Sequence, residues 1–134
     1  MFAIISAEHG ECAVEDVLAT QMLREELKKS PYQYREVTGC WTNSTEVAFQ
    51  VIKPIELDSR EFEEHLGSIA FGEFDQEAIL IVFDSFESFL EFNPRTPDRS
   101  VSTEHIGKWV EIEPHEAVAL PGWTSYNGQF YTTK

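Results

Sequence analysis

The sequence predicts an α+β fold, a ferredoxin-like β-α-β-β-α-β core with an extra C-terminal β-hairpin, in a single domain spanning residues 1–134. Three observations predict it. Patterns typical of strand, helix, strand, strand, helix and strand follow one another in the first 83 residues. The last of them, residues 78–83, is a continuous apolar run without polar alternation. Near the C-terminus, Asn127-Gly128 separates two alternating segments, which is the strongest short signal for a hairpin.

The first two elements are a short strand and a helix. Residues 2–6 favour a strand, which the polar segment 7–11 ends. Apolar residues then recur at helical spacing and define one face of a helix: Val14, Val17, Leu18, Met22, Leu23 and Leu27. Lys28 and Lys29 suit the negative end of the helix dipole, so we expect the helix to end there.

A hairpin and a second helix follow. Residues 32–40 and 46–52 are predicted to be the two arms of the hairpin, and Pro54 breaks the second arm. Asp58 is then placed to cap a helix, with Glu61 three residues later as in a capping box. The apolar face of this helix consists of Phe62, Leu66, Ile69 and Ala70.

The remaining chain is predicted to be β-structure. We expect residues 78–83 to be a strand buried on both faces and residues 86–92 to pair next to it. Residues 93–98 form a proline-punctuated loop. The last predicted strands are residues 108–112, 123–126 and 129–132.

Composition and charge exclude several classes of protein. With 42% hydrophobic and 25% charged residues the chain is typical of a globular domain. Its longest apolar run is too short to span a bilayer, and the N-terminus does not have the pattern of a signal peptide. Cys12 and Cys40 are expected to be reduced thiols of a cytoplasmic protein. A net charge of −14 argues against nucleic acid as a partner and favours cations or basic proteins.

Side chains that could carry out catalysis form no recognisable motif. The four histidines match no ligand spacing, so we expect no metal and no cofactor: His9, His65, His105 and His115. Three serines stand in no nucleophile-elbow context: Ser6, Ser59 and Ser102. Glu46 opens a strand after a tight turn, and Asp75, Gln76 and Glu77 precede the buried strand. These groups could approach one another at strand ends, or they could be solvated loop residues.

Short segments along most of the chain, in order, resemble those of one family. They are Phe2-Ala3-Ile4-Ile5-Ser6-Ala7, the helix end at residues 23–27 before Thr38-Gly39-Cys40-aromatic, residues 74–82, residues 107–114 and the hairpin at residues 122–131. Together they are similar to the phage-encoded S-adenosylmethionine lyases, formerly called S-adenosylmethionine hydrolases.

The resemblance implies an activity, an assembly and a location. S-adenosylmethionine would be the substrate, and its own carboxylate would attack the γ-carbon bonded to sulfur, which gives homoserine lactone and methylthioadenosine. The sheets would pack together in a homotrimer with active sites between subunits. Depletion of the substrate in the cytoplasm of an infected bacterial host would counter restriction that depends on it.

The same resemblance implies roles for individual residues. Glu46 is the first candidate to hold the substrate ammonium group, and Glu77 and Gln76 are the next. Trp41 is placed to cover adenine or to face the sulfonium. The relatives carry a tyrosine at this position, so a hydrogen bond from its hydroxyl cannot be made here in the same way.

Five further residues complete the predicted site. Ser6 and Ala7 are expected to bind substrate through backbone groups, and Gly39 and Cys40 through the hairpin tip, together with Asp75 before the buried strand. Two alternative functions stay open: an acidic, non-enzymatic inhibitor that mimics DNA and blocks a host DNA-binding enzyme, and a sensor that binds S-adenosylmethionine without turnover.

Overall fold

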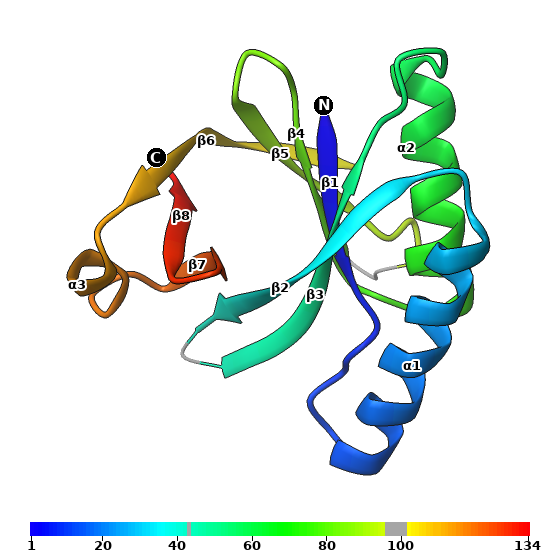
Figure 1. Cartoon of the computed structure of the whole chain (residues 1–134), viewed down its shortest axis with the longest axis horizontal. Coiled ribbons are helices and arrows are strands. Elements are labelled where there is room, and N and C mark those ends of the chain that lie inside the picture. Colours follow the sequence, from blue (N-terminus) through cyan, green and yellow to red (C-terminus); the bar gives the residue numbers. More distant parts are fainter. Residues whose placement is uncertain (43, 96–101) are drawn as a thin grey trace.

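The computed structural model describes residues 1–42, 44–95 and 102–134. Within these residues, eight antiparallel strands close into one barrel in the order β1-β3-β2-β7-β8-β6-β5-β4 (Figure 1). The strands are β1 (Phe2–Ser6), β2 (Gln33–Trp41), β3 (Ser44–Ile52), β4 (Ala78–Val82), β5 (Glu87–Phe92), β6 (Thr103–Ile112), β7 (Gly122–Tyr126) and β8 (Gln129–Thr133). The helices are α1 (Ala13–Lys29), α2 (Ser59–Gly67), which continues into the π-helical η1 (Ser68–Glu73), and the short α3 (Pro114–Ala117).

The predicted ferredoxin-like fold is wrong, because the strands after β4 do not form an appended hairpin. β5 continues the sheet from β4, β6 lies between β5 and β8, and β7 pairs with residues 38–41 of β2. A ferredoxin-like sheet would leave β2 at an open edge. Closure of the barrel pairs that edge with β7. It also covers the second face of the sheet, which would be exposed in an open sheet with helices on one side only.

Several local predictions are confirmed. The order of strands and helices up to β4 is as predicted. Asp58 caps α2, since its Oδ1 accepts a hydrogen bond from the Glu61 N–H at 3.0 Å. Asn127 and Gly128 both have positive φ, 49° and 77°, as a two-residue hairpin turn between β7 and β8 requires. The last three residues of the predicted loop 93–98 lie outside the described residues.

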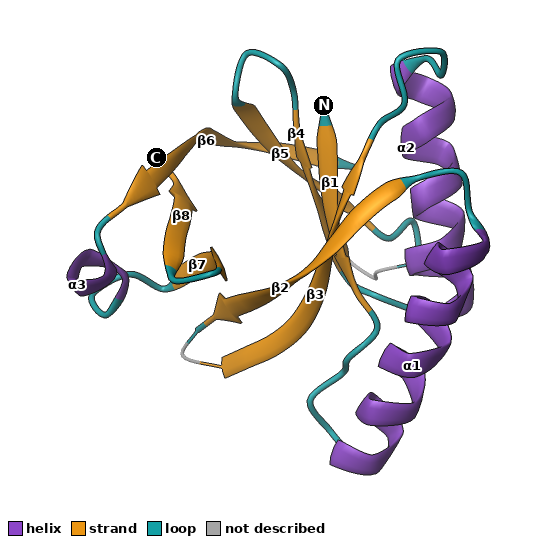
Figure 2. Ribbon diagram, in the orientation of Figure 1, coloured by secondary structure: helices purple, strands orange, loops and turns teal. Residues whose placement is uncertain are grey.

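The main core lies between the helices and the outer face of the barrel. Both long helices cover the same side, over the arc β4-β1-β3-β2 (Figure 2). Leu23 and Leu27 of α1 and Phe62 and Leu66 of α2 are completely buried against alternate residues of these strands. The strand residues in this core are Ala3, Ile5, Phe49, Val51, Ile79 and Ile81.

The other face of the same strands points into the barrel and carries a different kind of side chain. Phe2 of β1 meets Trp109 of β6 edge to face at 5.3 Å, and Trp109 stacks on Tyr131 of β8 at 5.3 Å. Arg35 of β2 lies over the ring of Tyr126 at 3.9 Å. Because β1 and β6 are not neighbours in the barrel, the Phe2–Trp109 contact crosses its interior.

The predicted apolar face of α1 is divided in the structure. Leu23 and Leu27 are buried, together with Asp16 and Thr20 on the same side of the helix. The other four apolar residues form an exposed stripe, with 60–68% of their surface accessible: Val14, Val17, Leu18 and Met22. No helix in the described part of the chain has the length and apolar character needed to cross a membrane.

Two acids, one on α1 and one on η1, lie close together and make stability depend on pH. Glu26 and Glu73 line a hollow of about 420 Å³ between the two elements. The pKa of Glu26 is raised from 4.5 to about 7. Burial is the largest cause, and the hydrogen bond to Glu73 and the charge of Glu73 add to it. Because the folded state binds this proton more tightly than the unfolded chain, stability falls as the pH rises from 4.5 to about 7.

Replacement of Glu26 by glutamine removes this effect. We expect Glu26→Gln to raise the Tm by a few degrees at pH 8 and to leave it unchanged at pH 4, where the wild-type carboxyl is already protonated. Thermal unfolding followed by circular dichroism at both pH values measures this. Glu56→Gln, at an exposed position outside this hollow, is the matched control. An equal shift for Glu26→Gln at both pH values would contradict the interpretation.

Candidate active site

Three predicted residues share the inner face of the barrel at the tip of the β2–β3 hairpin. Gly39 pairs with Glu46, and Trp41 pairs with Ser44, so these side-chain positions point the same way. Gly39 also pairs with Thr124 of β7 on its other side. A Cβ at Gly39 would lie 3.5 Å from the Cγ and 3.7 Å from the Oε1 of Glu46. Glycine therefore leaves space beside this carboxylate.

The Glu46 carboxylate lies in strongly acidic surroundings. Burial is the largest effect on its pKa and raises it above the ordinary value of 4.5. The nearby Ser6 hydroxyl opposes this increase, while the charges of Glu8 and Asp16 add to it. Glu46 is thus a half-buried acid, close to two others, in a place where a cation would relieve their repulsion.

The residues that follow β1 hold this part of β3 in place. The Ser6 hydroxyl donates to the carbonyl of Val47 at 3.0 Å, and the Glu8 carboxylate accepts from the Val47 N–H. The ladder between β1 and β4 ends at Ile4, which leaves the backbone of Ser6 and Ala7 beyond the paired part on that side. Ala7 is completely buried, backbone included, so it offers no exposed surface to a ligand in this structure.

Trp41 lies at the rim, with 65% of its surface exposed. Its six-membered ring rests on Gly122 of β7, where a Cβ would approach the Trp41 Cε3 to 2.9 Å. The N–H of the next residue, Thr42, donates to the carbonyl of Pro121 at 2.7 Å. Trp41 is therefore seated on β7 and still presents a large aromatic surface. Cys40, between Gly39 and Trp41, points to the opposite face of the strand and is half-buried.

The segment before β4 reaches the site through one residue. Gln76 is buried, and its Nε2 donates to the Glu8 carbonyl at 3.0 Å. Asp75 and Glu77 on either side are exposed. Asn93 binds this segment to the end of β5, since its Nδ2 donates to Gln76 O at 3.0 Å and its N–H to Glu77 O at 2.8 Å. Gln76 thus supports the loop after β1.

Sequence reasoning missed four residues of this region: Glu8, Asp16, Gly122 and Thr124. Glu8 and Asp16 looked like two of many scattered acids, and only the fold of the loop after β1 brings them to Glu46. Gly122 and Thr124 belong to a strand whose pairing with β2 has no local signal. The glycine before Trp123 was the one visible hint, since a glycine inside a strand marks close approach of another group.

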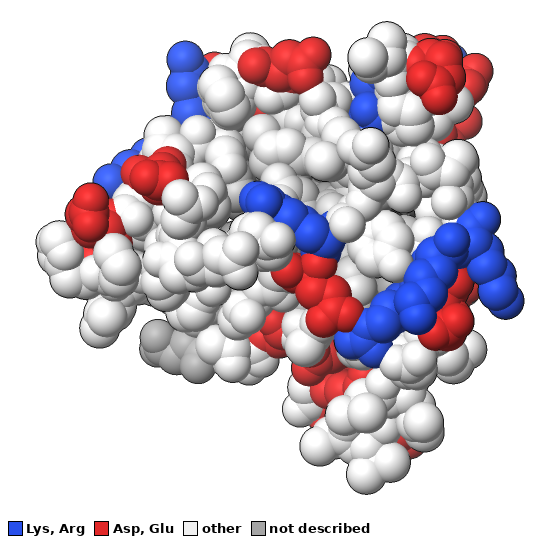
Figure 3. Space-filling view, in the orientation of Figure 1, with Lys and Arg blue, Asp and Glu red and all other residues white. Residues whose placement is uncertain are grey.

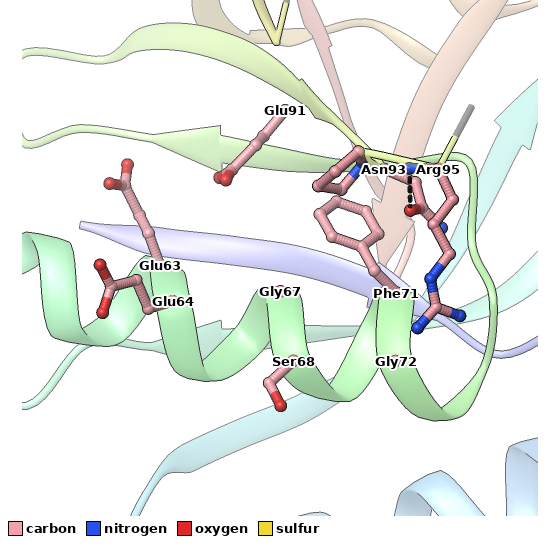
Figure 4. A pocket seen from close by; sticks show the side chains of 10 residues that line it. Glu63, Glu64, Gly67, Ser68, Phe71, Gly72, Glu91, Asn93 and Arg95 are labelled. Carbon is pink, nitrogen blue, oxygen red and sulfur yellow. Dashed lines mark hydrogen bonds between the residues drawn. The ribbon is translucent and has the colours of Figure 1, made fainter. Parts of the chain in front are cut away.

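A separate hollow of about 340 Å³ lies over α2, η1 and the end of β5 (Figure 4). Glu63 and Glu91 extend toward each other at one end, and Phe71 and Arg95 lie at the other. Burial raises the pKa of both acids, and the charge of Glu63 adds to the increase for Glu91. The hollow contains none of the predicted site residues, so we place the candidate site at Glu46.

The surface charge on one face of the molecule is mixed. The face in Figure 3 is mostly uncharged, and its acidic side chains gather mainly in the middle, beside a row of basic side chains. A DNA mimic presents a continuous row of negative groups, so this face gives that alternative no support. In the described residues, no group of three or more His, Cys, Asp or Glu side chains is arranged to hold a metal ion.

Comparison with known proteins gives one result. A sequence model of a family described as the S-Adenosylmethionine lyase family matches residues 3–134. The match extends from β1 to the C-terminal residue and so includes every strand that contributes to the candidate site. No curated protein matches the chain.

Proposed function

The chain belongs to the S-adenosylmethionine lyase family, and we propose that it cleaves S-adenosylmethionine to methylthioadenosine and homoserine lactone. The observation that carries this proposal is the half-buried Glu46, crowded by Glu8 and Asp16 and two residue pairs along the hairpin from the exposed ring of Trp41. An acidic, aromatic site of this kind suits a ligand with two positive groups, a sulfonium and an ammonium.

The proposed reaction is an intramolecular substitution. An oxygen of the substrate carboxylate forms a bond to the γ-carbon, and the bond from that carbon to sulfur breaks. The electron pair stays on sulfur, which becomes the neutral thioether of methylthioadenosine, and the γ-lactone carries away the unchanged ammonium group. No proton has to move in this step. The main task of the protein is to fold the substrate so that the carboxylate lies behind the γ-carbon, an orientation effect that can provide ~7–11 kcal/mol.

Glu46 performs the anchoring part of this task. Its carboxylate binds the substrate ammonium group and leaves the substrate carboxylate free to attack. Because Gly39 has no side chain, the space beside the Glu46 carboxylate is open to such a group. The substrate carboxylate and sulfonium lose their charges together, so a site with little water favours the transition state over the bound substrate.

Trp41 performs the covering part. Its ring faces the sulfonium or stacks on adenine. A cation–π interaction with the sulfonium contributes ~0.5–1 kcal/mol while exposed and ~2 kcal/mol once the ligand excludes water. Backbone groups of Ser6 and Cys40 add contacts to the substrate. Gln76 supports the loop that carries Glu8, and Asp75 and Glu77 extend the acidic rim from the segment before β4.

We also propose that three copies assemble with the sites between them, as a lyase of an infected bacterial cell that depletes S-adenosylmethionine and so counters restriction. The exposed apolar stripe of α1, Val14, Val17, Leu18 and Met22, supports an assembly. Val17 follows Asp16 in the sequence, but Asp16 lies on the buried side of α1 and the stripe on its exposed side. Light scattering of the purified chain measures its oligomeric state.

A product assay tests the proposed activity. We expect purified protein incubated with S-adenosylmethionine to release methylthioadenosine and homoserine lactone in equal amounts, resolved by liquid chromatography with mass detection. Absence of methylthioadenosine at high protein concentration contradicts the proposal. Calorimetric binding without product would then indicate a sensor. Capture of a basic protein that high salt releases would indicate the acidic inhibitor.

A further inference from the structure

We infer that Asp16 is a positioning residue of the site: its buried carboxylate fastens the loop after β1, and that loop fixes the place of Glu46. The inference rests on the proposed function, because the place of Glu46 affects catalysis only if the chain is a lyase. Asp16 itself belongs to the first turn of α1 and touches the loop, not the reacting groups.

The contact between α1 and the loop consists of two hydrogen bonds to one carboxylate. Asp16 is 8% exposed, its Oδ1 accepts from the His9 N–H at 2.8 Å, and its Oδ2 accepts from the Gly10 N–H at 3.0 Å. Gly10 has φ of 78°, a left-handed conformation that glycine adopts without strain and that turns both N–H groups toward the helix. Charge makes these bonds about twice as strong as neutral ones.

The loop passes this constraint on to β3. Glu8 precedes the two fastened residues, and its carboxylate accepts from the Val47 N–H, next in the chain to Glu46. The Glu8 N–H donates to the Ser6 hydroxyl at 3.2 Å, which itself donates to the Val47 carbonyl at 3.0 Å. Asp16, Glu8 and Ser6 therefore form one chain of contacts that ends at the backbone beside Glu46.

Asp16 also acts on Glu46 through its charge. Two nearby charged groups raise the pKa of the Glu46 carboxyl: Glu8 on the loop after β1 and Asp16 on α1. Burial acts in the same direction with larger effect, and the Ser6 hydroxyl acts against it. Removal of the Asp16 charge should therefore lower the pKa of Glu46, which a purely structural role would not do.

Asp16→Asn tests the inference, because it keeps the size of the side chain and removes its charge and one acceptor. We expect kcat/KM for methylthioadenosine release to fall about 10-fold. In the pH profile of kcat/KM, the acid limb, where the rate falls toward low pH, should move to lower pH. Carbon-13 NMR titration of Glu46 should give a lower pKa, and the amides of His9 and Gly10 should exchange faster. All assays are made well below the Tm of each variant.

Two further variants make the result specific. Glu15→Gln removes the same charge from the exposed neighbour of Asp16 and should change none of these quantities. Asp16→Glu keeps the charge and both acceptor oxygens, so its acid limb should stay where the wild-type limb is. If Asp16→Asn has the wild-type pH profile and the wild-type Glu46 titration, the inference is overturned. If the wild-type protein releases no product, the proposed function fails, and the titration of Glu46 still decides the role of Asp16.

Discussion

Glu46→Gln is expected to lower kcat/KM for methylthioadenosine release on the order of 100-fold, without loss of the fold. An amide can still accept a hydrogen bond from the substrate ammonium, but it offers no negative charge, and hydrogen bonds to charged groups contribute about 1.5–3 kcal/mol. The substrate is then held less firmly in the folded shape that its own carboxylate needs for attack. Initial rates at several substrate concentrations measure the change.

The same variant should be more stable than the wild type above neutral pH. The raised pKa of Glu46 means that the folded protein keeps this proton more tightly than the unfolded chain does. The ionised group therefore destabilises the folded state as the pH rises through its pKa, and glutamine removes that effect. A higher Tm together with lower activity is the result typical of a functional residue held in unfavourable surroundings.

The pH dependence of the wild-type enzyme follows from the same group. In the proposed mechanism the ionised form of Glu46 binds the substrate ammonium, so kcat/KM should fall as the pH decreases through a pKa above 4.5. Glu56→Gln, at an exposed position, is the matched control for the loss of one negative charge. Unchanged turnover in Glu46→Gln would show that another group binds the ammonium.

The hairpin that carries Glu46 could be predicted from the sequence, and much of the candidate site with it. Alternation along the two arms places Gly39, Trp41 and Glu46 on one face whatever the rest of the fold is. The neighbours of this face could not be predicted. Glu8 and Asp16 reach Glu46 only because Gly10 turns the loop back onto α1, and one sequence does not show which acids such a turn brings together.

The error in the fold has a clear physical origin. Residues 78–83 are predicted to be buried on both faces; in the structure Ile79, Ile81 and Val82 are buried, whereas Ala78, Leu80 and Phe83 are half-buried. Helices cover only one side of this strand, so something else had to cover the other. The missing layer is the second half of the barrel, closed by pairing of residues 38–41 with residues 122–125. Such a contact between distant segments has no signal in local propensity or periodicity.

Proline substitutions in β7 should distinguish the closed barrel from an appended hairpin. Successive residues of a strand direct their N–H groups to opposite neighbours. Thr124 and Ser125 of β7 have partners in both β2 and β8, Gly39 and Thr38 on one side and Tyr131 and Phe130 on the other. We expect Thr124→Pro and Ser125→Pro each to lower the free energy of unfolding by roughly 2–4 kcal/mol, because either one removes a ladder hydrogen bond.

The two proline variants are compared because Thr124 and Ser125 direct their N–H groups to opposite neighbours of β7. If β7 were an edge strand, one of its two adjacent N–H groups would point to solvent, and proline there would be tolerated. In the barrel neither group is free, so both variants should lose on the order of 10 °C in Tm. Thr124→Ala and Ser125→Ala, which keep the backbone N–H, should each change the free energy of unfolding by about 1 kcal/mol or less. A wild-type Tm for either proline variant would mean that β7 pairs on one side only, and that Gly122 and Thr124 do not adjoin Trp41 and Gly39.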